Sequence, residues 1–103
     1  MAALAVYTTV GSRDDAVAMA RTVVERRLAA CAQIDAIESV YRWEGRLQQE
    51  AEFRILFKTE AARYAELEAA IRELHSYELP AIYAVAVERA DAAYASWVKE
   101  EVR

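Results

Sequence analysis

The sequence predicts an α+β domain with the ferredoxin-like order β-α-β-β-α-β, an antiparallel sheet and an added C-terminal helix. Two observations carry this prediction. Segments with strand-like apolar patterns alternate with segments of helical periodicity along all 103 residues. Two β-rich runs, at 40–43 and 53–57, also flank Gly45, one of only two glycines, as expected for a long hairpin. We expect residues 1–103 to form one domain.

The first part of the chain is predicted to form a strand and a helix. Residues 3–10 are apolar or β-branched at both odd and even positions, which is typical of a central strand covered on both faces. Gly11 ends this strand, and Ser12 followed by Asp15 resembles a capping box. Apolar residues then recur at helical spacing up to Leu28. We therefore expect a helix over 13–28.

The next two strands are predicted to form the hairpin. Gly45 can supply the positive φ of a tight reversal, and the arms, 31–43 and 48–59, exceed the usual strand length of about five or six residues. In the first arm the apolar positions change from even at Ile34 to odd at Ile37. Because a strand alternates with period two, we expect a bulge or bend near Asp35 and Ala36.

The last part of the chain is predicted to add a helix, a strand and a short helix. An apolar stripe that includes Leu67 and Ile71 indicates a helix from about residue 59 to about residue 75. Pro80 favours extended backbone before it, and residues 81–87 are expected to form a strand buried on both faces. Asp91 is expected to cap the C-terminal helix.

The length of the hairpin predicts an oligomer, because a domain of this size cannot cover such arms with its own helices. Trp43 and Glu44 lie at the hairpin tip. They either anchor a neighbouring subunit or serve only as turn residues, and we favour the interface because aromatic residues dominate interface energetics.

Composition excludes several classes of function. The net charge is −4 with acidic and basic residues interspersed, so nucleic-acid binding is disfavoured. No apolar run approaches the roughly 20 residues that span a bilayer, and the N-terminus lacks the features of a signal peptide, so we expect a soluble cytoplasmic protein without a membrane partner. Phosphate-binding loops and hydrolase motifs are absent from the sequence. We therefore expect no enzymatic activity and no organic cofactor.

The segment 75–80 holds the first candidates for a metal site. His75 and Glu78 lie three residues apart in a loop and can converge on one divalent ion, since imidazole suits copper or zinc and a carboxylate can complete the coordination. Alternatively, His75 interacts with the end of the preceding helix and Tyr77 belongs to the core. Cys31, the only cysteine, is either a small buried apolar residue or a further ligand.

Five motifs together resemble the CutA family of divalent-cation tolerance proteins. They are ERRLAAC at 25–31, YRWEG at 41–45, LFKT at 56–59, HSYELP at 75–80 and YASW at 94–97. The resemblance implies a ferredoxin-like homotrimer, similar in assembly to PII signalling proteins, in which the long hairpins pair between subunits. It also implies association with copper and other divalent cations in metal tolerance. The metal-site candidates it implies are His75 and Glu78, with Cys31 as a further motif cysteine.

The chain departs from the family pattern at three places. Ser76 replaces a proline that usually follows the histidine, and 34–37 replaces an Ile-Pro-Gly bend with one residue fewer. Thr8 lies where some members carry a cysteine that can bind copper. The expected function is that of a trimeric divalent-cation-binding protein in metal tolerance. The alternative is a PII-like regulatory module that binds a small molecule or partner protein in clefts between subunits.

Overall fold

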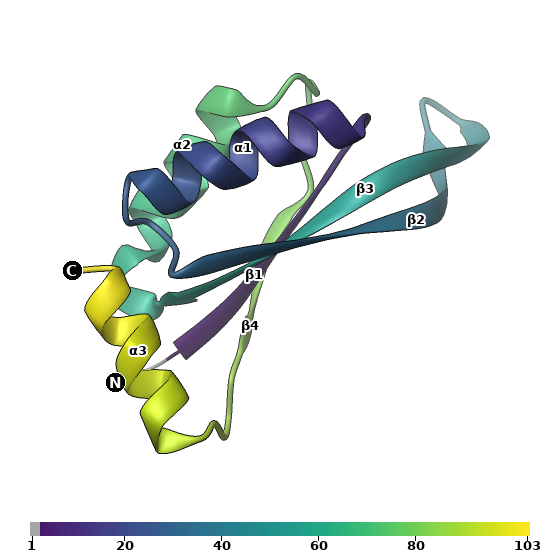
Figure 1. The fold of residues 1–103 in the computed structure, drawn as a ribbon. Helices are drawn as coiled ribbons and strands as arrows, with labels where there is room; N and C mark the ends of the chain where they lie inside the picture. Colours follow the sequence, from purple (N-terminus) through teal and green to yellow (C-terminus); the bar gives the residue numbers. More distant parts are fainter. Residues whose placement is uncertain (1–2) are drawn as a thin grey trace.

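The computed structural model describes residues 3–103 and confirms the predicted α+β fold. The chain forms a four-stranded antiparallel sheet in the order β2-β3-β1-β4, as in ferredoxin-like domains. Helices α1 and α2 lie on one face of this sheet, and α3 lies at the end of the sheet where β1 begins (Figure 1). The elements are β1 (Ala3–Val10), α1 (Arg13–Glu25), β2 (Cys31–Trp43), β3 (Arg46–Glu60), the 3-10 helix η1 (Ala61–Arg63), α2 (Tyr64–Leu74), β4 (Ile82–Ala86) and α3 (Ala92–Glu101).

The core lies between the sheet and helices α1 and α2. The even positions of β1 and the odd positions of β3 point into it, as their apolar pattern predicted. Leu67 and Ile71, from the predicted stripe of α2, complete the same cluster. Its fully buried members include Val6, Val23, Ile55, Phe57, Leu67 and Ile71.

Helix α1 begins as predicted and ends earlier than predicted. The Ser12 side chain accepts a hydrogen bond from the Asp15 amide, at 3.1 Å, which confirms the cap. Arg27 adopts a positive φ of 59°, and the amides of Arg27 and Leu28 bond back to the carbonyls of Val24 and Val23. This is a Schellman ending. The expected extension of the helix to Leu28 is therefore wrong.

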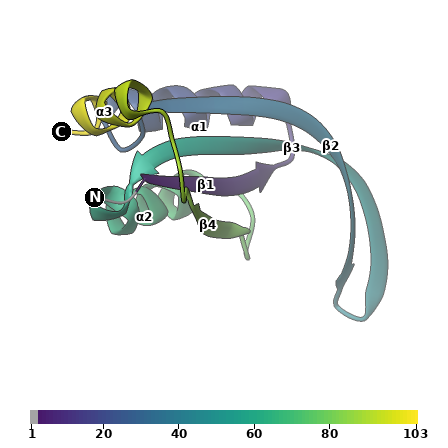
Figure 2. The ribbon, with the colours of Figure 1, turned by 90° about the horizontal axis from the view of Figure 1, so that it is seen from below.

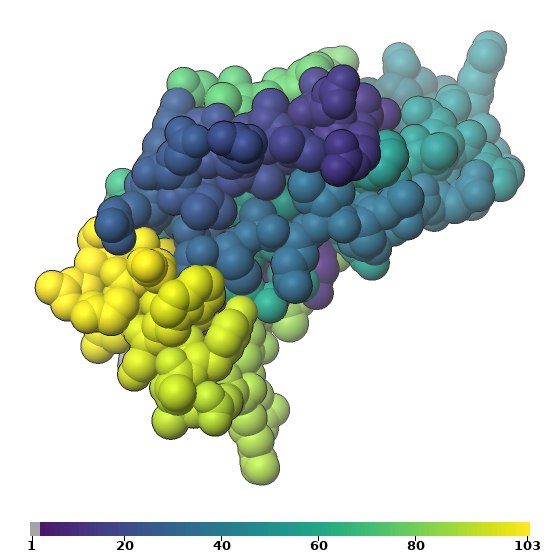
Figure 3. Space-filling model, in the orientation of Figure 1, coloured from purple at the N-terminus to yellow at the C-terminus, as the bar shows by residue number. Residues whose placement is uncertain are grey.

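The hairpin of β2 and β3 contains no bulge. Pairing is continuous from Cys31 opposite Lys58 to Trp43 opposite Arg46, and Glu44 and Gly45 form the reversal with φ of 50° and 77°. Of the bulge or bend expected near Asp35 and Ala36, the bulge is wrong, although Gly45 does mark the turn. The arms do bend away from the body, by a curvature of the whole hairpin (Figure 2). They extend the chain to 44 Å along its longest axis, against 25 and 22 Å along the others (Figure 3).

The change of apolar parity in β2 reflects a change of partner across the sheet. Close to the body, even positions such as Ala32 pack on the core below the helices. Further out, odd positions such as Ile37 and Tyr41 line the concave side of the hairpin, together with Tyr77 from the loop after α2. One face of the regular strand therefore packs on the core near the body, and the opposite face lines the hairpin further out. No inserted residue is needed for this change.

Strand β4 lies at the edge of the sheet, paired only with β1 within the described chain. Tyr83 is 52% exposed and Val85 is 50% exposed, so the expected burial on both faces is wrong for a single chain. The central position of β1 is confirmed, but its second face is only partly covered. There Tyr7 stacks on Tyr83 with ring centroids 5.3 Å apart, and the Arg54 guanidinium lies 5.9 Å from the Tyr7 ring.

The C-terminal helix confirms its predicted cap. The Asp91 carboxylate accepts a hydrogen bond from the Tyr94 amide at 3.0 Å. Across residues 3–103, every helix is too short or too polar to cross a membrane.

Candidate functional site

His75 directly follows α2, and its side chain contacts the backbone of β1. Its Nε2 lies 2.8 Å from the carbonyl oxygen of Thr9, and its Nδ1 accepts a hydrogen bond of 3.1 Å from the Tyr77 amide. A carbonyl only accepts and an amide N–H only donates, so Nε2 carries the proton and Nδ1 keeps its lone pair. The ring is therefore a neutral imidazole that fixes the loop after α2 through two backbone groups.

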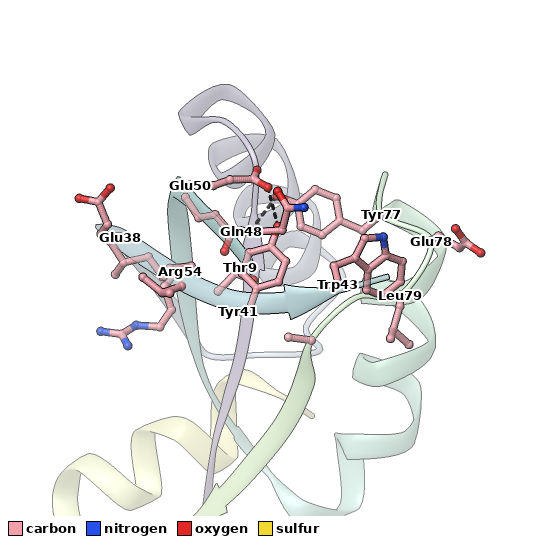
Figure 4. A pocket seen from close by; sticks show the side chains of 15 residues that line it. Thr9, Glu38, Tyr41, Trp43, Gln48, Glu50, Arg54, Tyr77, Glu78 and Leu79 are labelled. Carbon is pink, nitrogen blue, oxygen red and sulfur yellow. Dashed lines mark hydrogen bonds between the residues drawn. The ribbon is translucent and has the colours of Figure 1, made fainter. Parts of the chain in front are cut away.

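Of the other two predicted ligands, Glu78 shares the loop after α2 with His75. Its side chain is exposed and borders the same hollow beside the hairpin as Tyr77 (Figure 4). The Cys31 sulfur lies 3.7 Å from the Tyr94 hydroxyl at the start of β2.

Cys31 and His75 lie at opposite ends of the sheet. Cys31 pairs with Lys58, which pairs in turn with Ala5 of β1. His75 instead bonds Thr9, four residues further along β1. Four strand residues correspond to about 13 Å, so one chain cannot place Cys31 and His75 on the same ion. Among residues 3–103 we also find no group of three His, Cys, Asp or Glu side chains that could hold a metal ion.

A hollow of about 1200 Å³ lies on the concave side of the hairpin. It is formed by β1, β2, β3 and the loop after α2, which bring together side chains distant in sequence (Figure 4). Aromatic rings and carboxylates dominate the part nearest the loop. The side chains on which the chemistry of this hollow depends are Tyr41, Trp43, Tyr77, Glu50 and Glu52.

Two tyrosine–glutamate hydrogen bonds organise this hollow. The Tyr41 hydroxyl donates to Glu50 at 2.5 Å, and the Tyr77 hydroxyl donates to Glu52 at 2.8 Å. The bond to Glu50 is the main cause that raises the pKa of Tyr41 to about 12. Burial, and then the bond to Glu52, raise the pKa of Tyr77. Both phenols therefore stay protonated and neutral at physiological pH.

Gly11 leaves room for the Tyr77 ring. A Cβ at this position would lie 3.3 Å from the Tyr77 hydroxyl oxygen, closer than comfortable packing allows. The glycine that ends β1 thus also allows Tyr77 to approach Glu52, which is only 6% exposed.

The sequence did not single out Glu50 and Glu52, and Tyr77 was considered only as a core residue. A usable signal existed for Tyr41 and Glu50. Once the Gly45 turn pairs Trp43 with Arg46, Tyr41 lies opposite Gln48 and diagonal to Glu50, within reach of a long side chain. The contact of Tyr77 with Glu52 depends on the path of the loop, which no local pattern indicates.

Comparison with known proteins places the chain among divalent-cation tolerance proteins. Residues 4–101 match the family described as CutA1 divalent ion tolerance protein. Divalent-cation tolerance protein CutA of Thermotoga maritima is 37% identical over 97 residues, covering 94% of this chain and 96% of that protein. The protein of the same name from Archaeoglobus fulgidus is 34% identical over 97 residues, covering 94% and 95%.

Solved structures show the same similarity. CutA of Archaeoglobus fulgidus, described as a periplasmic divalent cation tolerance protein, superposes with a TM-score of 0.96 at 33% identity, covering 98% of this chain and 99% of that one. CutA of Synechococcus elongatus gives a TM-score of 0.96 at 30% identity, covering 99% and 91%. The chain therefore belongs to the CutA1 family of divalent ion tolerance proteins.

Proposed function

We propose that this chain serves divalent-cation tolerance by binding the cation itself, as a cytoplasmic homotrimer that catalyses no reaction. The observation that carries the proposal is the match, over nearly the whole chain, to proteins named for divalent-cation tolerance. Copper and zinc are the proposed ions, because the single histidine of the chain supplies a ligand that suits both.

His75 is the first proposed ligand. Nδ1 has the lone pair that a metal requires, and it becomes available when the Tyr77 amide turns away from it. Nε2 can then keep its hydrogen bond to Thr9, which would orient the ring as the outer-shell bonds of metal-binding histidines do. Glu78 is exposed in the same loop, so its carboxylate is free to join. Cys31 would bind a separate ion, or join one only through another subunit.

The homotrimer is proposed from surfaces that the single chain leaves uncovered. Near the tip of the hairpin, Val40 is 60% exposed and Leu47 is 72% exposed, and β4 is an open edge. Such apolar surface usually marks an interface. Light scattering should give three times the chain mass of 11.6 kDa. A monomer would contradict this part of the proposal.

Calorimetric titration of metal-free protein with Cu(II) and Zn(II) tests the ligand assignment. We expect saturable binding that is lost in His75→Ala and weakened in Glu78→Gln. Glu25→Gln is the matched control, because it removes the same charge from an exposed position on α1. Weak binding of equal strength in all variants would contradict the assignment. Glu78→Gln keeps the test decisive if His75→Ala disturbs the loop.

The second candidate function is a PII-like regulatory module that binds a small molecule. The hollow beside the hairpin favours it, because its volume of about 1200 Å³ exceeds what one hydrated metal ion fills and is large enough for a small organic molecule. Cells that depend on the protein would distinguish the two functions: full function with His75→Ala favours the regulatory module.

A further inference from the structure

We propose that Asp15 of α1 is the carboxylate that shares a divalent cation with His75, in a small hollow between α1 and the end of α2. The inference rests on the metal binding proposed above and names a further ligand for the same site. This helix-side hollow lies with α1 and α2 on the helix-covered face of the sheet (Figure 1). The homotrimer is proposed from other surfaces, at the hairpin and the edge at β4.

The helix-side hollow brings together polar side chains from two parts of the chain. His75 and Ser76 border it from the segment that follows α2, and Asp15 and Thr22 border it from α1. Residues seven positions apart share one face of a helix, so Asp15 and Thr22 both face the hollow. Its volume is about 140 Å³. That is the space of about five water molecules, which suits a metal ion with its bound waters.

His75 and Glu78 open onto different hollows. Among the described residues, His75 borders the helix-side hollow and Glu78 does not, whereas Glu78 borders the larger hollow beside the hairpin and His75 does not. Glu78 can therefore share an ion with His75 only if the loop turns. Asp15 already borders the same space as the imidazole, so it is the better placed of the two carboxylates.

The Asp15 carboxylate is held in place and is available. The Ser12 side chain accepts a hydrogen bond from the Asp15 amide at 3.1 Å, which fixes the backbone of this first turn. The carboxylate itself is exposed, and within residues 3–103 it takes part in none of the ion pairs. A ligand on a helix is positioned more precisely than one on a loop.

The donor set of the helix-side hollow fits Zn(II) or Cu(II). Both ions accept an imidazole nitrogen together with a carboxylate oxygen, and the hydroxyls of Thr22 and Ser76 can hydrogen-bond to coordinated water. None of the described residues that border the hollow is a lysine or an arginine, so no fixed positive charge opposes a cation. Residues 3–103 contain no group of three His, Cys, Asp or Glu side chains that could hold a metal ion. Water therefore completes the coordination, and we expect weaker binding than at a structural zinc site.

Calorimetric titration of the intact protein with Zn(II) tests the inference by comparing Asp15→Asn with Asp14→Asn. Both variants remove one negative charge from the first turn of α1 and so change its interaction with the helix dipole alike, but only Asp15 borders the helix-side hollow. We expect roughly tenfold weaker binding in Asp15→Asn, a smaller loss in Glu78→Gln, and binding by Asp14→Asn within roughly twofold of the unchanged protein. Circular dichroism and molecular mass check the fold and assembly of each variant.

Asp15→Glu is the second variant, because it keeps the carboxylate and the charge if Asp15→Asn disturbs the start of α1. It should retain more binding than Asp15→Asn, and the reverse order would overturn the inference. Equal binding by Asp15→Asn and Asp14→Asn would also overturn it. If His75→Ala still loses binding in that case, the proposed metal site stands without Asp15. If the unchanged protein does not bind Zn(II) saturably, the inference and the proposed metal binding both fail.

Discussion

The bond between Tyr77 and Glu52 gives the most specific test of how the hairpin is fixed to the body. Glu52 is 6% exposed, and the Tyr77 hydroxyl donates to it at 2.8 Å. Removing that hydroxyl in Tyr77→Phe keeps the ring but leaves a buried carboxylate without this donor. Hydrogen bonds to charged groups contribute about 1.5–3 kcal/mol. Tyr77 is only partly buried, so we expect a loss of about 2 kcal/mol in the free energy of unfolding.

Urea unfolding at matched protein concentration measures this loss, because subunit association makes stability depend on concentration. Tyr83→Phe is the control, since it makes the same chemical change on a half-exposed ring. The double variant Tyr77→Phe with Glu52→Gln should lose less than the sum of the two single variants. Equal stability of Tyr77→Phe and Tyr83→Phe, or strictly additive losses, would refute the role given to this bond.

Three further predictions concern the core and the hairpin. Phe57→Ala should lower the free energy of unfolding by about 3–5 kcal/mol in urea, because Phe57 is fully buried. Thr8→Val should raise it by about 1 kcal/mol, because the buried Thr8 hydroxyl has no hydrogen-bond partner among the described residues; an unchanged midpoint would contradict this. The hydrogen bond to Glu50 raises the pKa of Tyr41 from 10.0 to about 12. The stability linked to this shift is therefore complete below pH 10 and is lost as pH rises through about 12. An absorbance titration should show one phenol fewer ionising near pH 12 in Tyr41→Phe than in the unchanged protein.

Features set by neighbouring residues were predictable from the sequence. The caps at Ser12 and Asp91 and the reversal at Gly45 each depend on a side chain or a glycine within a few positions. The buried face of β3 around Phe57 followed from simple alternation. These local rules fixed the element order and therefore the fold class.

Two features of the fold were not predictable from local sequence patterns. The early end of α1 depends on a positive φ at Arg27, a position where a glycine would have given the signal and an arginine does not. The apolar residues of β4 indicated burial, but Tyr83 is exposed in the single chain. An apolar pattern does not show whether the same chain or another chain buries a strand.

The candidate site also combines a residue that the sequence singled out with contacts that depend on the tertiary structure. The sequence indicated His75 as a metal ligand, and no local pattern could indicate that both its nitrogens contact the backbone of Thr9 and Tyr77. The hollow required the curvature of the hairpin and the path of the loop after α2, which bring Glu52 to Tyr77. Both are properties of the tertiary structure.

Nitrogen NMR of the imidazole ring would show whether a divalent cation binds at His75. His75 is the only histidine, so its ring signals need no assignment by mutation. The metal-free protein should show a protonated Nε2 and an unprotonated Nδ1. On adding Zn(II), we expect a large shift of the Nδ1 signal together with a change at the Tyr77 amide. Ring signals that stay unchanged at saturating Zn(II) would contradict it.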